Sequence, residues 1–85
     1  MEYYFKSSAL KDLRRLPKPV QRRIIQKIEF YLESKTPLAF AEPLKDHVFG
    51  EFRFRIGDYR VIFDGDPKRG AIVVLAVGHR KDIYK

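Results

Sequence analysis

Hydrophobic residues recur at intervals of three to four in the first third of the chain, which is the spacing of one face of an α-helix. The clearest stripe predicts a helix that begins near Pro19, because proline suits the first turn of a helix. This stripe consists of Val20, Ile24, Ile25, Ile28, Tyr31 and Leu32. A shorter stripe, of Ala9, Leu10, Leu13 and Leu16, predicts an earlier helix. We expect Ser7 or Ser8 to cap that helix and Pro17 to end it, so that the two helices form a hairpin.

The hydrophobic period changes to two in residues 52–56, which is the spacing of a β-strand. The apolar residues of this strand point to one side, and Arg53 and Arg55 point to the other. Residues 59–63 and 71–77 predict two further strands, with turn sequences between them. The segment 71–77 is apolar on both faces, which is typical of a central strand.

Two more segments complete the predicted fold. Residues 2–6, Glu-Tyr-Tyr-Phe-Lys, favour a short first strand. Residues 35–43 contain two prolines and no period, which predicts a connection whose Leu38 and Phe40 pack back against the core. The order strand, helix, helix and three strands predicts a two-layer α+β fold, with the helical hairpin on one face of a four-stranded, mainly antiparallel sheet. We expect residues 1–85 to form a single domain.

Composition narrows the possible functions. The 85 residues carry 18 Lys and Arg against 11 Asp and Glu, a formal net charge of +7 that favours a polyanionic partner such as nucleic acid or an acidic protein. There is no cysteine, so a disulfide scaffold is excluded. No ligand spacing indicates a metal site, and we expect no cofactor. No apolar run is long enough to span a membrane, so a cytoplasmic protein is the simplest interpretation.

The last third of the chain holds the residues that suit cleavage of a phosphodiester. Arg60 lies among apolar strand neighbours, Arg80 follows the apolar strand, and Tyr84 is the penultimate residue. Guanidinium groups match phosphate oxygens with two parallel N–H donors. Cutting RNA also needs a proton acceptor for the attacking 2′-hydroxyl and cations for the extra negative charge. We therefore expect Arg60, Arg80 and Tyr84 to gather in one catalytic site.

Each candidate also has a plain structural explanation. Arg60 would form an ordinary salt bridge if it met a carboxylate, and the nearest candidates in sequence are Asp58, Asp64 and Glu51. Arg53, Arg55 and Arg80 would be solvated surface charges, and Tyr84 would pack its ring on the domain. A catalytic pair of His47 and His79 is a further possibility, because histidine titrates near neutral pH, but nothing in the sequence brings the two together.

Two motifs together carry a resemblance to a known family. The segments Gly57-Asp58-Tyr59-Arg60-Val61-Ile62 and Gly78-His79-Arg80-Lys81-Asp82-Ile83-Tyr84, with Arg53 and Arg55 before them, resemble the RelE branch of the RelE/ParE toxin superfamily. The likeness covers essentially the whole chain and includes the first strand and the helical hairpin.

The resemblance implies a toxin of a type II toxin–antitoxin system. Such a toxin enters the ribosomal A site on the 30S subunit and cuts messenger RNA without a metal ion. The residues matching Arg60 and Arg80 bind the reacting phosphate, and the tyrosine matching Tyr84 transfers a proton or stacks on a base. RNA-binding residues are expected at Arg53, Arg55, Lys45, His79 and Lys81. The implied protein partner is an acidic antitoxin that folds over the basic face.

Two other functions remain open from the sequence. The first is a DNA gyrase inhibitor of the ParE type, which would use the same fold without cutting RNA. The second is a module that binds its antitoxin and has no catalytic activity.

Overall fold

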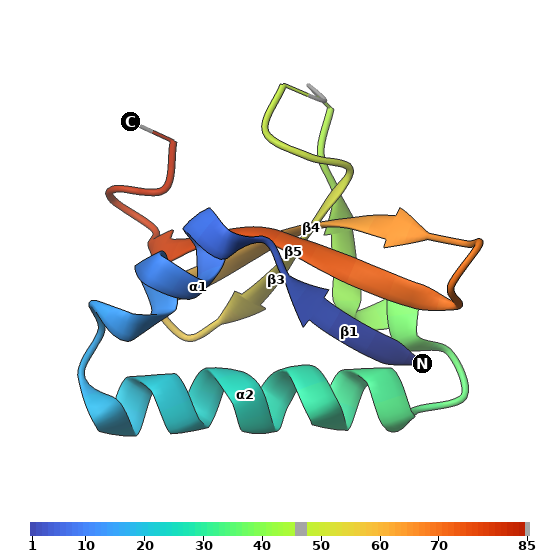
Figure 1. The fold of residues 1–85 in the computed structure, drawn as a ribbon, viewed down its shortest axis with the longest axis horizontal. Helices are drawn as coiled ribbons and strands as arrows, with labels where there is room; N and C mark the ends of the chain where they lie inside the picture. The colour runs from blue at the N-terminus through green and yellow to red at the C-terminus, as the bar shows by residue number, and fades with distance from the viewer. Residues whose placement is uncertain (46–47, 85) are drawn as a thin grey trace.

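The computed structural model describes residues 1–45 and 48–84, and in this part of the chain two α-helices lie on a five-stranded sheet (Figure 1). The elements are β1 (Glu2–Phe5), α1 (Ser7–Arg14), α2 (Lys18–Glu33), a 3₁₀ turn η1 (Pro37–Phe40), β2 (Ala41–Pro43), β3 (Phe52–Ile56), β4 (Tyr59–Asp66) and β5 (Ala71–His79). The strand order is β1-β5-β4-β3-β2. β1 runs parallel to β5, and the other neighbouring pairs are antiparallel. The predicted α+β class is therefore confirmed.

The prediction of four strands is wrong by one, because β2 lies inside the segment expected to be a connection. Ala41–Pro43 pairs with β3 at the edge of the sheet. Proline is tolerated in an edge strand, where its missing N–H faces away from the ladder. β4 extends beyond its predicted end to Asp66, which pairs with Ala71, and β5 extends beyond its predicted end to His79, which pairs with Tyr59.

The helix boundaries differ from the expected ones near α1. Ser7 is the first helical residue, Lys6 occupies the N-cap position, and no side chain forms a capping hydrogen bond there. The expected serine cap is therefore wrong. α1 ends at Arg14, before Pro17, which instead occupies the N-cap of α2. Pro19 lies in the first turn of α2, as its fixed backbone angle predicts.

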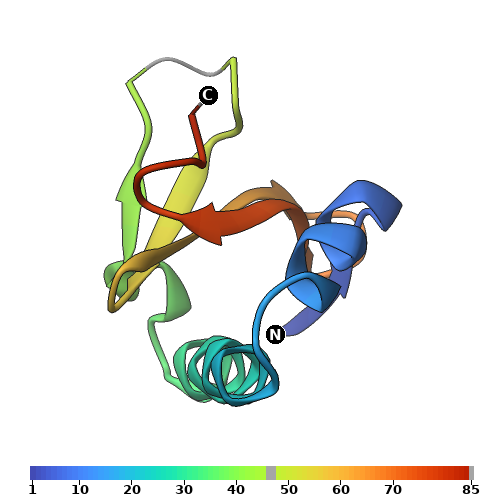
Figure 2. The ribbon, with the colours of Figure 1, turned by 90° about the vertical axis from the view of Figure 1, so that its left-hand side faces the viewer.

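The hydrophobic core lies between α2 and the sheet (Figure 2). Ile24, Ile28 and Leu32 of α2 are buried, as their spacing predicts. Phe54 and Phe63 pack ring to ring from neighbouring strands, with centroids 4.5 Å apart. These contacts fix the helical layer beneath β3 and β4.

The sequence predicted that Leu38 and Phe40 of the 3₁₀ turn would pack against this core, and that prediction is wrong. Leu38 and Phe40 both remain exposed. Phe40 stacks its ring on Tyr31 of α2 at a centroid distance of 4.7 Å, so it covers the margin of the core rather than entering it. The turn therefore tethers the end of α2 to the start of β2.

The opposite face of the sheet receives Arg53 and Arg55, as predicted. Figures 1 and 2 both show the tail after β5 and the segment that leads into β3 on the side of the sheet away from α2. Phe49, which precedes β3, meets Tyr84 edge to face, with ring centroids 5.2 Å apart. None of the helices in the described residues is long and apolar enough to cross a membrane.

The core assignment predicts that Ile28→Ala destabilises the protein by about 2–5 kcal/mol, because it removes a fully buried side chain and leaves a cavity. Urea denaturation followed by circular dichroism measures the change. Phe30→Ala is the control on the same helix, since Phe30 is 60% exposed, and it should cost less than about 1 kcal/mol. Equal losses for the two variants would contradict the assigned orientation of α2.

Candidate functional site

Arg60 is the centre of the candidate site and the one charged residue among the buried residues that the structure describes. It is 7% exposed. In the sheet it lies opposite Arg55 of β3 on one side and opposite Gly78 of β5 on the other. Since directly opposite residues share a face of a sheet, Arg60 and Arg55 project from the same side.

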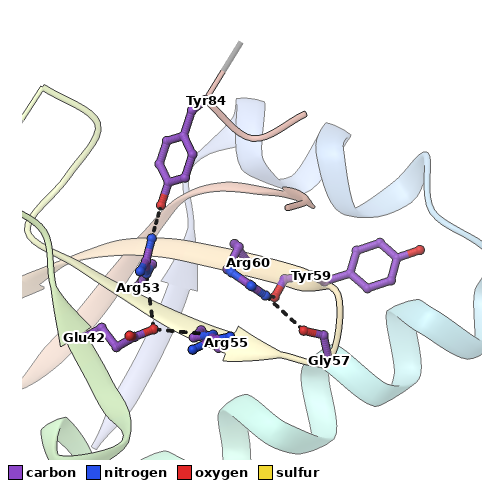
Figure 3. Close-up of polar contacts among 7 residues, drawn as sticks. All are labelled: Glu42, Arg53, Arg55, Gly57, Tyr59, Arg60 and Tyr84. Atoms are coloured by element: carbon purple, nitrogen blue, oxygen red, sulfur yellow. Dashed lines mark hydrogen bonds and ion pairs between the residues drawn. The ribbon is translucent and has the colours of Figure 1, made fainter. Parts of the chain in front are cut away.

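The guanidinium of Arg60 is held by backbone rather than by a carboxylate. Its Nη1 donates hydrogen bonds to the carbonyl oxygens of Gly57, at 3.0 Å, and Tyr59, at 2.9 Å (Figure 3). Its Nε and Nη2 donate to none of the residues that the structure describes. Arginine has five N–H donors, so an anion that reached this group would find unused ones.

The carboxylates that the sequence offered as partners of Arg60 are engaged elsewhere. Asp58 lies 3.7 Å from the Nε of Arg80. Asp64 accepts a hydrogen bond from the backbone N–H of Glu51, and Glu51 accepts one from that of Gly65. These contacts hold Glu51, which precedes β3, against β4. The simple salt-bridge explanation of Arg60 is therefore wrong for these three residues.

The electrostatic surroundings of Arg60 are cationic. Burial lowers the pKa of Arg60 from its ordinary value, and the charges of Arg55, Arg53 and Arg80 lower it further. The carboxylate of Glu42 opposes part of this effect. Arginine stays protonated at neutral pH in spite of such shifts. The protein therefore keeps an incompletely neutralised positive charge at this point, which is a favourable place for an anion.

The chain beyond β5 folds back over the sheet. The backbone N–H of Arg80 donates to Asp58 O at 2.8 Å, and those of Asp82 and Ile83 donate to His79 O. A Cβ on Gly78 would lie 3.2 Å from Ile83 Cδ1, so the turn packs closely over this glycine. Arg80 is thereby placed beside the β3–β4 turn, with its side chain 56% exposed.

This turn places Tyr84 on the side of the sheet that carries Arg53, Arg55 and Arg60, which we call the arginine face. The phenol oxygen of Tyr84 accepts a hydrogen bond of 2.9 Å from Nη1 of Arg53 (Figure 3). The ring also contacts Phe49 edge to face. Arg53, Arg55, Arg60 and Tyr84 thus lie on one face of the sheet, although they come from two strands and the tail. Arg80 of the tail lies close enough to Arg60 for its charge to lower the pKa of that residue.

Glu42 is a component of the site that the sequence analysis missed. It lies on β2 directly opposite Arg53. Its Oε1 is 3.2 Å from Nε of Arg53 and 3.7 Å from Nε of Arg55. Nothing in the sequence placed Glu42 near the arginines, because residues 35–43 were interpreted as a connection. The strand β2 is what brings Glu42 beside Arg53 and Arg55.

The remaining predicted RNA-binding residues lie at the margins. Lys45 and Lys81 are both exposed. His79 meets Tyr59 edge to face at 5.5 Å, and its Nδ1 accepts a hydrogen bond from the backbone N–H of Lys81. His47 lies outside the described residues, so the suggested histidine pair stays a hypothesis. Within residues 1–45 and 48–84, no group of three or more His, Asp or Glu could hold a metal ion.

Taken together, the fold and this face define a small basic α+β protein that presents clustered guanidiniums and a phenol to an anionic ligand. The chain belongs to the family of ParE toxins of type II toxin–antitoxin systems, within the RelE/ParE superfamily, because the family's sequence model matches residues 3–84. The resemblance drawn from the two motifs is thereby confirmed.

Individual relatives support the same family. Toxin RelG of Mycobacterium tuberculosis is 33% identical over 81 residues, which cover 95% of this chain and 92% of that protein. The toxin–antitoxin complex RelBE2 of the same organism contains a chain that is 30% identical, with a TM-score of 0.75 and coverage of 93% of this chain and 96% of that one. The isolated RelE toxin of E. coli shares the fold at 22% identity, with a TM-score of 0.72 and coverage of 92% and 82%.

The burial of Arg60 among other cations predicts that Arg60→Met raises Tm. Methionine fills a similar space without the cost of desolvating a charge beside like charges. A gain of about 1 kcal/mol would raise Tm by about 4–8 °C in a domain of this size. Thermal denaturation at low and high salt measures the effect, which should shrink as salt screens the repulsion. Arg80→Met is the matched control at an exposed position and should change Tm less. A lower Tm for Arg60→Met would show that its two backbone hydrogen bonds outweigh the repulsion.

Proposed function

We propose that this toxin is a ribosome-dependent, metal-independent endoribonuclease that cleaves messenger RNA in the A site. The observation that carries this proposal is the buried guanidinium of Arg60, which has no carboxylate partner among the described residues and lies close enough to Arg80 for that charge to lower its pKa. Tyr84 is held on the same side of the sheet by its hydrogen bond from Arg53. A phosphate would meet unused donors of Arg60, and a phenol stands at the end of the same face.

The proposed reaction is attack of the 2′-hydroxyl on the adjacent phosphorus. The new O–P bond forms as the bond to the 5′-oxygen of the next nucleotide breaks, leaving a cyclic phosphate and a free 5′-hydroxyl. Arg60 and Arg80 bind the non-bridging oxygens and stabilise the added negative charge of the pentacoordinate state. The 2′-hydroxyl loses a proton and the leaving 5′-oxygen gains one, so the reaction consumes no net proton. Tyr84 takes part in this proton transfer, assisted by the cationic N–H donor that Arg53 places on its oxygen.

RNA binding extends outward from this centre. Arg55 lies beside Arg60 and is positioned to contact a neighbouring phosphate. Lys45, Lys81 and His79 add charge or hydrogen-bonding groups at the margins, where they would contact the messenger or the ribosome in the cytoplasm. Their contribution is electrostatic and should fall as salt concentration rises.

We also propose an acidic antitoxin as the protein partner. The relative in RelBE2 of M. tuberculosis was solved in a toxin–antitoxin complex, as was a RelE of Pyrococcus horikoshii that is 28% identical to this chain, with a TM-score of 0.71. The net charge of +7 favours an acidic segment that folds across the arginine face.

The description of the matching family favours one alternative, a ParE-type inhibitor of DNA gyrase. An inhibitor that works by binding has no need of a phenol hydrogen-bonded to an arginine. The contact between Arg53 and Tyr84 therefore favours the nuclease.

The nuclease proposal predicts that Arg60→Ala lowers the rate of messenger cleavage on programmed ribosomes by about 10²–10³-fold, because it removes preorganised donors to the transition state. Arg80→Ala should act in the same direction. Tyr84→Phe keeps the ring but removes the hydroxyl, and should lower the rate by about 10²–10⁴-fold. Arg14→Ala, which removes an exposed charge from α1, is the control and should retain activity. Unchanged cleavage in both the Arg60 and Arg80 variants would refute the assignment.

A nuclease and a gyrase inhibitor are distinguished by which nucleic acid is cut in cells, messenger RNA or chromosomal DNA. On induction of the wild-type chain, we expect growth arrest and primer extension stops at codon-associated positions in messenger RNA. Chromosomal DNA should stay intact in the same cultures. Double-strand breaks without messenger cuts would instead identify gyrase as the target. Normal growth on expression of the chain alone would favour an antitoxin-binding module.

A further inference from the structure

Glu42 is the carboxylate that opposes the cationic charges around Arg60, and the proposed reaction assigns it no task. It projects from β2 toward the two arginines of β3. A carboxylate beside a phosphate site repels the substrate, so its presence there needs a reason other than RNA binding. The reason lies in what it does to Arg53.

Arg53 is held from two directions. Its Nε donates to Glu42 Oε1 at 3.2 Å, and its Nη1 donates to the phenol oxygen of Tyr84 at 2.9 Å (Figure 3). The guanidinium is rigid and planar, so an acceptor fixed at Nε also fixes the direction of the Nη1 hydrogens. Tyr84 and, to a smaller extent, Glu42 raise the pKa of Arg53, which is the direction expected when both hydrogen bonds favour the cation.

The backbone also makes Glu42 a firm anchor. β2 places it directly opposite Arg53, and the short ladder with β3 runs from Ala41 opposite Phe54 to Pro43 opposite Phe52. Phe54 is fully buried, so the core fixes the position of Ala41, its partner in this ladder and the residue before Glu42. A contact that starts from such a strand can orient a side chain that the tail carries.

We propose that Glu42 is a positioning residue that aims the guanidinium of Arg53 at the phenol oxygen of Tyr84. The inference rests on the proposed nuclease function for its catalytic consequence. Glu42 fixes Arg53, Arg53 fixes the phenol, and the cationic N–H stabilises negative charge that develops on that oxygen during proton transfer. Glu42 itself exchanges no proton with the RNA.

The kinetic test is a double-mutant cycle with cleavage on programmed ribosomes. Glu42→Gln should lower kcat by about 10- to 100-fold, since a misdirected catalytic group costs about that much. KM should stay unchanged or fall, because a negative charge leaves the RNA-binding face. Glu33→Gln removes the same charge from an exposed position on α2 and should change neither constant.

The decisive comparison is made in the Tyr84→Phe background. If Glu42 acts through Arg53 on the phenol, Glu42→Gln causes no further loss once the hydroxyl is absent. A full loss from Glu42→Gln in that background would overturn the proposal and identify Glu42 as a group that acts directly on the substrate.

A second measurement needs no activity and separates failure of this inference from failure of the nuclease assignment. The protein is labelled with carbon-13 at the tyrosine Cζ, and the Tyr84 signal is assigned by its absence in Tyr84→Phe. Arg53→Ala should move this signal, Glu42→Gln should move it in the same direction, and Glu33→Gln should leave it in place. A Tyr84 signal that Arg53→Ala moves and Glu42→Gln does not would refute the positioning role even in a protein that cuts RNA. The expected shifts in a protein that cuts nothing would support the positioning contact and count against the nuclease.

Discussion

The burial of Arg60 without a carboxylate partner among the described residues is the constraint on which the rest of the site depends. A charge withdrawn from water is costly, and here three further arginines add to the cost. Two backbone carbonyls offset part of it. The remainder must be carried by the apolar core on the other face of the same strand. Under the proposed function, stability is given up locally for RNA binding and is supplied by packing elsewhere.

The alternation of side chains along each strand separates core packing on one face of the sheet from the arginine site on the other. On β4, Val61 and Phe63 enter the core beside α2, and Arg60 faces the other way. On β3, Phe54 enters the core, and Arg53 faces the other side of the sheet. A one-residue slip of register would send arginine into the core, so the hydrophobic pattern that stabilises the fold also fixes where the guanidiniums project. The site inherits its precision from the core.

The sequence predicts those features that depend on periodicity. The stripe of α2, the orientation of Arg53 and Arg55, and the strand that carries Arg60 all follow from local spacing. The partnership of Glu42 with Arg53 does not, because it needs an edge strand of three residues that ends in proline, where local signals favour a connection. Nor does the contact of Arg53 with Tyr84, 31 residues away, since it depends on a turn that packs over Gly78. Only tertiary structure brings these groups together.

The arginines differ in their carboxylate partners, and this difference determines where a bound phosphate would be stabilised most. Arg80 pairs with Asp58 at the surface, and Arg53 and Arg55 share Glu42. Exposed ion pairs are weak, so an incoming phosphate can displace them, but it must still compete with the carboxylates. At Arg60 it meets no such competitor among the described residues and relieves repulsion between cations. In the proposed reaction this asymmetry draws one phosphate of the RNA to Arg60, at the inner end of the face, while its neighbours are held more loosely by the surrounding arginines.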